Sequence, residues 1–206
     1  VAFVAAFTVV IGTSLAWIVS MYEFPGVNVF KWLLILPMAI PTYVNGYIYS
    51  GLNETSGILF NVMEYCFGLG PYVYNLYDLQ NIYGVIFIMT ISLYPYVYLL
   101  CFPAFANHSY SVFEVGKSLG LNKYQRLTKI GLPIVRPAVV AGVSFVIMET
   151  LAEYATMEYF GVPTFATGIF RAWFVLGDEV SSFRLSSILL TLVFFLIYFE
   201  EMSRGK

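Results

Sequence analysis

Residues 82–106 read IYGVIFIMTISLYPYVYLLCFPAFA, a run without a single Asp, Glu, Lys or Arg. A helix needs about 20 mostly apolar residues to cross the hydrocarbon core of a bilayer. We therefore predict a membrane-spanning helix here. The whole chain agrees, because its 206 residues are 60% hydrophobic and only 11% charged, whereas soluble domains are about 25% charged. A chain this apolar needs lipid as its solvent.

Four further apolar stretches are predicted to span the membrane: Val1–Tyr22, Trp32–Leu52, Pro133–Ala152 and the shorter Leu185–Phe199. All but Pro133–Ala152, which contains Arg136 and Glu149, are free of charged residues. The sequence thus predicts an all-α, polytopic membrane protein of about five spans, with Ile82–Ala106 as the third. Two other apolar stretches are interrupted by charges, glycine and proline. We expect short helices at the membrane surface in Thr55–Tyr77, and a re-entrant or interfacial element in Gly161–Leu176.

The positions of the basic residues predict the orientation, because cytoplasmic loops carry an excess of Lys and Arg. Five spans leave the two termini on opposite sides of the membrane. One orientation leaves only Arg171 and Arg184 outside, and the other eight basic residues inside: Lys31, Lys117, Lys123, Arg126, Lys129, Arg136, Arg204 and Lys206. We therefore expect a periplasmic N-terminus, a cytoplasmic C-terminus and a cytoplasmic connector over Asn107–Leu132.

That connector has the pattern of two short helices. Ser111 followed three residues later by Glu114 fits a capping box at a helix start, and Gly120 fits the end of that helix. A second short helix is predicted over Asn122–Lys129. Two short helices at an angle form a compact wedge with a few apolar side chains among basic residues. This pattern is typical of an element that rests on anionic lipid headgroups, or of a surface that docks a partner protein. The pattern alone leaves both interpretations open.

Within the connector and the start of the next span, five residues have a recognisable spacing: Glu114, Gly120, Ile130, Leu132 and Pro133. This spacing resembles the signature of permease subunits in type I ABC importers, which reads Glu-Ala-Ala, three residues, Gly, nine residues, Ile-x-Leu-Pro. Val115 and Gly116 stand where the signature has its two alanines.

The resemblance implies a mechanical role for the connector. In that family it forms the coupling helix, which sits in a cleft of the nucleotide-binding subunit and transmits closure driven by ATP. The resemblance assigns this role to Glu114, Gly116, Gly120, Leu121, Ile130, Leu132 and Pro133.

Further stretches, spread over nearly the whole chain, resemble ferric-iron importer permeases: Leu36–Val44, Tyr94–Leu100, Met148–Tyr154, Glu158–Trp173 and Glu200–Gly205. Those permeases usually fuse two homologous halves, and this sequence is similar to the first half. It also begins at Val1 rather than at a methionine. We therefore expect residues 1–206 to be one type I permease domain and a fragment of a longer chain.

The same resemblance implies a bacterial inner-membrane location and three kinds of protein partner. These are ABC ATPase subunits, a second permease half, and a periplasmic binding protein that docks on the outer loops near Glu54–Asp78 and Glu158–Arg184. The implied substrate is ferric iron. Related importers for thiamine, polyamine or phosphonate share the coupling loop, so the choice of substrate rests on the resemblance.

Glu149 and Glu153 are unusual because they lie at the end of the predicted fourth span, near Ala152, four residues apart and so on one helical face. Carboxylates inside a membrane usually face a bundle interior or a water-filled cavity. The pair could therefore line a translocation pathway for a cationic substrate, with Glu149 as the deeper residue. Alternatively, both lie near the outer interface, where the span ends.

The sequence offers little for bond chemistry. His108 is the one histidine, Cys66 and Cys101 are the two cysteines, and no Gly-rich phosphate loop with Lys-Ser/Thr occurs. We expect no catalytic residues, no metal site, no cofactor and no nucleic-acid partner. An ion-driven secondary transporter with Glu149 and Glu153 as its relay is the main alternative, and it leaves the connector's signature unexplained.

Overall fold

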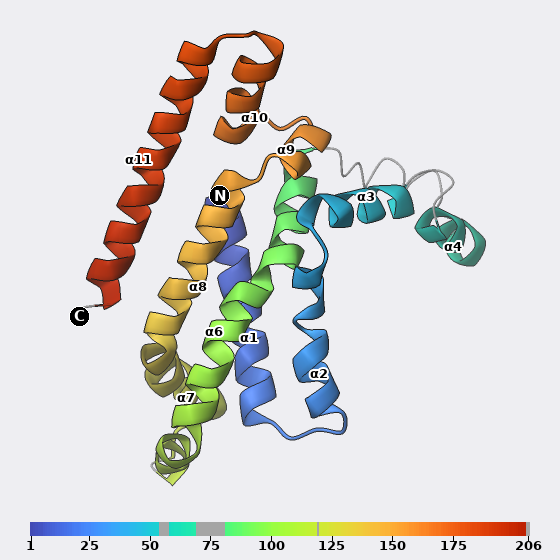
Figure 1. The fold of residues 1–206 in the computed structure, drawn as a ribbon. Coiled ribbons are helices and arrows are strands. Elements are labelled where there is room, and N and C mark those ends of the chain that lie inside the picture. The colour runs from blue at the N-terminus through green and yellow to red at the C-terminus, as the bar shows by residue number, and fades with distance from the viewer. Residues whose placement is uncertain (54–57, 69–80, 119, 205–206) are drawn as a thin grey trace. The chain divides into compact units, whose positions relative to one another are not determined.

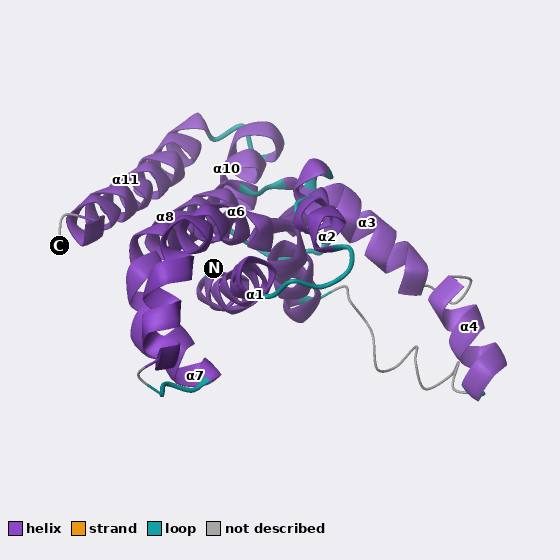
Figure 2. Cartoon of the chain, turned by 90° about the horizontal axis from the view of Figure 1, so that it is seen from below, coloured by secondary structure: helices purple, strands orange, loops and turns teal. Residues whose placement is uncertain are grey.

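The computed structural model describes residues 1–53, 58–68, 81–118 and 120–204. This part of the chain consists of helices and the loops between them, without a strand (Figures 1 and 2). Four helices are long and apolar enough to cross a membrane. They are α1 (Ala2–Met21), α6 (Ile82–Ser118), α8 (Leu132–Ala152) and α11 (Glu179–Arg204). The predicted all-α polytopic fold is confirmed.

The predicted second span, Trp32–Leu52, is wrong as a single helix. It is divided among three elements: α2 (Val27–Leu33), the 3₁₀ turn η1 (Leu36–Ala39) and α3 (Thr42–Asn53). Proline lacks the backbone N–H that a continuous helix needs, and Pro41 instead starts α3 by accepting the N–H groups of Val44 and Asn45. The two parts form a bent pair, which makes a fifth span only if both parts are counted as one.

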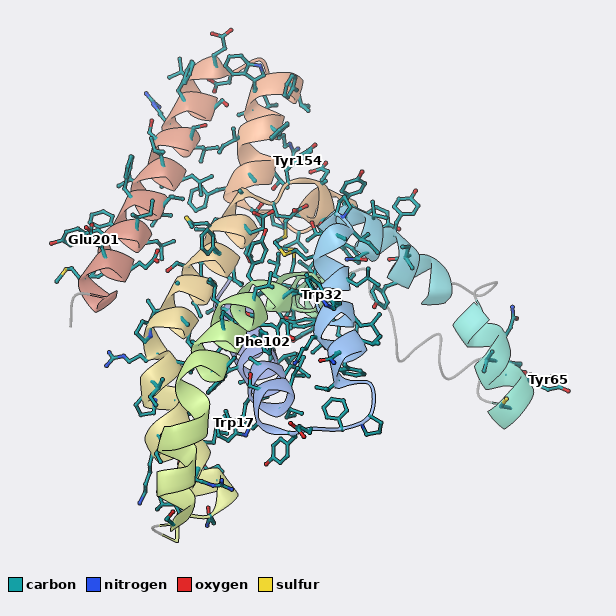
Figure 3. All side chains as sticks on the ribbon, turned by 60° about the horizontal axis from the view of Figure 1, so that its bottom comes forward. Trp17, Trp32, Tyr65, Phe102, Tyr154 and Glu201 are labelled. Carbon is teal, nitrogen blue, oxygen red and sulfur yellow. The ribbon has the colours of Figure 1, made fainter. Side chains whose placement is uncertain are left out.

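The remaining described helices are short. They are α4 (Ile58–Phe67), α7 (Lys123–Arg126), α9 (Ala155–Tyr159) and α10 (Phe165–Phe170), with π-helical turns at η2 (Leu127–Gly131) and η3 (Arg171–Val175). The helix α4 is a short helix within the predicted range Thr55–Tyr77, and Tyr65 on it (Figure 3) is 93% exposed. The rest of Thr55–Tyr77 lies largely outside the described residues.

The last helix, α11, begins six residues earlier than Leu185 because Asp178 caps it. The Asp178 carboxylate accepts the backbone N–H of Ser181 at 2.9 Å and also the Ser181 hydroxyl. These hydrogen bonds favour the charged carboxylate, so they hold the pKa of Asp178 below its ordinary value. A capped, charged start of this kind is typical of a helix N-terminus.

The chain divides into two compact units. Unit 1 contains Val1–Ala39, Leu93–Glu149 and Thr191–Lys206, and unit 2 contains Ile40–Ser92 and Thr150–Leu190.

In unit 1, α1 and α8 both approach α6 closely at Val97. A Cβ atom placed on Gly12 of α1 would lie 2.8 Å from the Val97 Cβ, and one on Gly142 of α8 would lie 2.8 Å from the Val97 Cα. Small residues let membrane helices approach until their backbones touch. Val97 is fully buried at this junction, as is Phe105 two turns further along α6.

In unit 2, α3 is held against α6 and the α9 region. The Asn45 amide donates a hydrogen bond to the Ser92 hydroxyl at 2.9 Å, and both residues are buried. A Cβ on Gly46 would meet the Phe160 ring at 2.9 Å, and the rings of Tyr47 and Tyr159 lie 4.8 Å apart. Hydrogen bonding, close approach and ring contact therefore all fix α3.

We predict that Gly142→Ala destabilises the protein. Its new Cβ would meet the Val97 backbone, which cannot rotate away, so we expect a loss of about 1–3 kcal/mol in the free energy of unfolding. The measurement is thermal unfolding of the purified chain in detergent. Gly51→Ala in α3 is the control, because a Cβ there meets nothing within 4 Å and alanine favours helix. An equal loss in both variants would contradict the packing account.

Candidate functional site

The connector between α6 and α8 differs from the predicted pair of short helices. The helix α6 continues past Ala106 to Ser118, so Ser111 lies inside a helix and does not cap one. Residues 107–112 contain neither glycine nor proline, and nothing there forces the hydrogen-bond ladder to stop. The first predicted helix is therefore the last part of α6, which passes through Pro95 and Pro103 without ending.

Gly120 ends α6, as predicted. Its φ of 77° lies in the left-handed region, where glycine has no Cβ penalty. The N–H of Leu121 bonds back to the Gly116 carbonyl at 3.1 Å, which is the long hydrogen bond of a Schellman motif. The Leu121 side chain also lies against Gly116, which supplies the apolar contact of that motif.

A capping box does occur in the connector, but at Asn122 and Gln125. The Asn122 side chain accepts the Gln125 N–H at 2.8 Å, and the Gln125 side chain accepts the Asn122 N–H at 3.0 Å. This pair fixes the start of α7, in agreement with the predicted second helix at Asn122. The predicted box at Ser111 is wrong, although the Asn-x-x-Gln pattern of the true one is present in the sequence.

No loop separates α7 from α8. The chain passes from α7 through the π-helical turn η2 directly into α8, and the Leu132 N–H bonds to the Leu127 carbonyl. Pro133 cannot donate to a helix ladder, and a wider turn just before it accommodates that missing bond. Single π turns are frequent at functional sites.

Three of the signature residues meet in one contact. A Cβ on Gly116 would lie 2.7 Å from the Ile130 Cδ1 and 3.6 Å from a methyl of Leu121. Glycine at this position, where the resembling family has alanine, thus leaves the space that Ile130 fills. The stem of Arg126 lies beside the same contact, at 3.5 Å. We refer to Gly116, Leu121 and Ile130 as the connector core.

The other signature residues lie around the connector core. Leu132 and Pro133 are exposed at the start of α8, and Gly120 is exposed at the turn. Glu114 lies in the α6 backbone, but its side chain is outside the described part of the structure, as is Leu119. Tyr124 on α7 is 73% exposed and is the most prominent aromatic side chain of the described connector.

The connector is anchored to the rest of unit 1 through Gly131. A Cβ there would meet Trp17 of α1 at 3.1 Å and Phe105 of α6 at 3.3 Å, and these two rings pack edge to face (Figure 3 labels Trp17). Near the middle of α6, the Tyr98 hydroxyl donates to the Lys31 carbonyl at 3.3 Å. The Lys31 ammonium also lies 5.6 Å from the Phe102 ring, within cation–π range.

The two carboxylates of the predicted fourth span have different surroundings. Glu149 is exposed on α8. Glu153 lies just beyond the end of α8 at Ala152, so the prediction that both share one helical face is wrong. Its carboxylate accepts hydrogen bonds from the hydroxyl of Thr42 at 2.7 Å and from the N–H and hydroxyl of Thr156, both at 2.8 Å.

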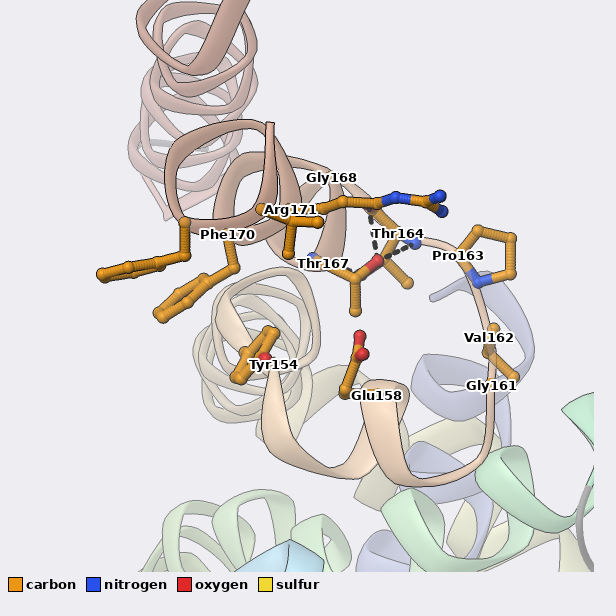
Figure 4. A pocket seen from close by; sticks show the side chains of 12 residues that line it. Tyr154, Glu158, Gly161, Val162, Pro163, Thr164, Thr167, Gly168, Phe170 and Arg171 are labelled. Carbon is orange, nitrogen blue, oxygen red and sulfur yellow. Dashed lines mark hydrogen bonds between the residues drawn. The ribbon is translucent and has the colours of Figure 1, made fainter. Parts of the chain in front are cut away.

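Unit 2 contains an open pocket of about 660 Å³ that the sequence did not predict. Figure 4 shows the Glu158 carboxylate pointing into it, beneath Thr167. One wall is aromatic, because the rings of Tyr154 and Phe170 are stacked with their centroids 4.0 Å apart. Arg171 also lines the pocket. Apart from Tyr154 and Glu158, the lining residues fall in Gly161–Leu176, for which an interfacial element was predicted, and α10 with η3 forms a short apolar helix there.

Known proteins resemble this chain over most of its length. The ferric-iron permease "Fe(3+)-transport system permease protein FbpB 2" of Haemophilus influenzae is 24% identical over 95% of this chain and 34% of its own length. The sulfate transport system permease protein CysT of Escherichia coli is 29% identical, over 77% of this chain and 54% of its own. The maltose/maltodextrin transport system permease protein MalF of Vibrio vulnificus is 26% identical, over 92% of this chain and 39% of its own length.

The chain thus spans about a third to a half of the length of these relatives. The family model described as "binding-protein-dependent transport system inner membrane component" matches residues 8–199. Because that match covers nearly the whole sequence, the chain belongs to this family of ABC transporter permease components.

Proposed function

We propose that the chain is the permease component of an ATP-driven importer and that its connector transmits movement of the ATPase subunits to α6 and α8. The observation that carries the proposal is the connector core, in which Gly116 before the turn contacts Leu121 and Ile130 after it. Family membership supports the same role.

The described part of the connector is suited to transmit force because its turn is capped on both sides. A Schellman motif and a capping box flank the turn on its two sides, and η2 runs directly into α8. A push on exposed Tyr124 would therefore reach α8 as a movement of a rigid body. Gly131, seated against Trp17 and Phe105, would carry part of that movement to α1.

The remaining partners follow from the family. A periplasmic binding protein would deliver the substrate on the outer side, where Glu158–Arg184 lies in the predicted orientation, and a second permease half would complete the pathway. The other predicted docking segment, Glu54–Asp78, is largely outside the described residues. Lys31 contacts Tyr98 and Phe102, which lie in the half of the predicted span Ile82–Ala106 nearer the connector, and this supports a cytoplasmic position for both.

Ferric iron is the substrate we propose. The ferric-iron permease of Haemophilus influenzae matches 95% of this chain, although sulfate and maltose permeases match it as well. Exposed Glu149 on α8 adds a carboxylate that suits a cation better than sulfate or an uncharged sugar. We infer that Glu149 lines the pathway.

We predict that Gly120→Val uncouples ATP hydrolysis from transport. A β-branched residue at a φ of 77° is strained, and relief of that strain would open the turn and displace Leu121 and Ile130. We expect stimulation of ATPase activity by the loaded binding protein to fall at least about fivefold, measured on the reconstituted complex.

Gly177→Val is the matched control, because Gly177 also has a positive φ, at 63°, and a Cβ there also meets nothing within 4 Å. Both variants should lose similar stability, of about 1–2 kcal/mol, but only Gly120→Val should uncouple. Normal stimulation in Gly120→Val would show that the connector does not couple to an ATPase.

We predict that Glu149→Ala lowers ferric-iron uptake into proteoliposomes severalfold at unchanged expression and unfolding temperature. The physical reason is the loss of a negative charge from the pathway. Glu201→Gln removes a carboxylate from the exposed surface of α11 and should transport normally. Equal uptake by wild type and Glu149→Ala would show that Glu149 does not line the pathway.

A further inference from the structure

Glu153 connects two places where the helical chain is interrupted. One is the start of α3 after the break at residues 40–41, and the other is the step from α8 to α9. The Glu153 Oε2 accepts the Thr42 hydroxyl at the first break, while Oε1 accepts both donors of Thr156 in the first turn of α9. A single carboxylate therefore holds two segments, and its bond to Thr42 joins residues 111 positions apart in sequence.

These hydrogen bonds occupy most of the carboxylate. Two oxygens offer about four lone-pair sites, and three donors already fill three of them. Thr156 is fully buried, so removal of its partner would leave a buried hydroxyl and a buried N–H without this acceptor. Hydrogen bonds to a charged group are stronger than those between neutral groups, and buried donors left without an acceptor add a penalty.

The α9 segment that Glu153 holds is also a wall of the pocket in unit 2. Tyr154 and Glu158 lie on either side of Thr156 and both line the pocket. Tyr159 at the end of α9 contacts Tyr47 of α3. Glu153 and this ring contact thus fasten the pocket wall to α3 at two points.

We propose that Glu153 is a positioning residue that couples the break in the bent pair to the α9 wall of the pocket. When α3 moves, Glu153 carries Tyr154 and Glu158 with it and so changes the opening of the pocket. Its role is to hold these segments through Thr42 and Thr156, and it does not bind the transported substrate. The consequence for uptake rests on the proposed function, whereas the coupling itself does not.

The test is hydrogen–deuterium exchange of the full chain, read on peptides from the start of α3 and from α9. We expect Glu153→Ala to raise exchange about tenfold or more in both segments, as the loss of hydrogen bonds to a charged group implies. Thr42→Val should raise exchange in α9 as well as in α3. The double variant should exchange no faster than Glu153→Ala, because both changes break one network.

Two further variants separate positioning from substrate binding. Glu153→Gln keeps an oxygen that can accept from Thr156 and an amide that can donate to the Thr42 hydroxyl, so it should retain wild-type exchange and uptake within about twofold. Thr90→Val is the control, because the buried Thr90 hydroxyl donates to the Ile86 carbonyl of its own helix. It should leave exchange at both segments unchanged.

Three results would overturn the proposal: unchanged α9 exchange in Thr42→Val, additive effects in the double variant, or wild-type exchange but lost uptake in Glu153→Gln. The last result would show that the charge itself acts on the substrate. Exchange is measured without substrate. If wild type and all variants fail to take up ferric iron while exchange follows the pattern above, the choice of iron fails and the coupling stands.

Discussion

Val97 of α6 touches two neighbouring helices at once because the residues that face it, Gly12 and Gly142, have no side chain. Water is absent from the hydrocarbon region, so hydrophobic burial contributes little there and contact between helices depends on close packing. This junction fixes α1 and α8 to α6 within unit 1. The proposed coupling through the connector would depend on this junction, because a force applied at α7 can move α1, α6 and α8 together only if they are already in contact.

The connector in unit 1 and Glu153 in unit 2 both join separate helical segments. In unit 1, a turn between long helices is made stiff by backbone caps and by the contact of Ile130 with Gly116. In unit 2, broken helices are tied by side chains, since Thr42 and Thr156 share one carboxylate. A transporter that changes shape needs both kinds of element. Rigid segments transmit force, and helix interruptions that are joined by hydrogen bonds determine where the chain bends.

Much of this could be predicted from the sequence, and the remainder has physical reasons. Apolar runs with few or no charges predicted α1, α6, α8 and α11 because lipid selects apolar helices by length. The hydropathy pattern does not reveal the helix break at residues 40–41, since Pro41 is as uncharged as its neighbours. The sequence offered two capping boxes, at Ser111 and Asn122, and only the path of α6 decides between them. The role of Glu153 was hidden because its partner Thr42 is distant in sequence.

If the connector couples transport to ATP hydrolysis, it lies against an ATP-hydrolysing subunit, and photo-crosslinking would detect that contact. A photoreactive amino acid at Tyr124 would be compared with one at Phe174 of unit 2, since both side chains are 73% exposed. Illumination of membranes that contain the whole transporter should join position 124, but not position 174, to the ATPase subunit. Crosslinks from position 124 to lipid alone would contradict the account and would make the connector an element of the membrane surface.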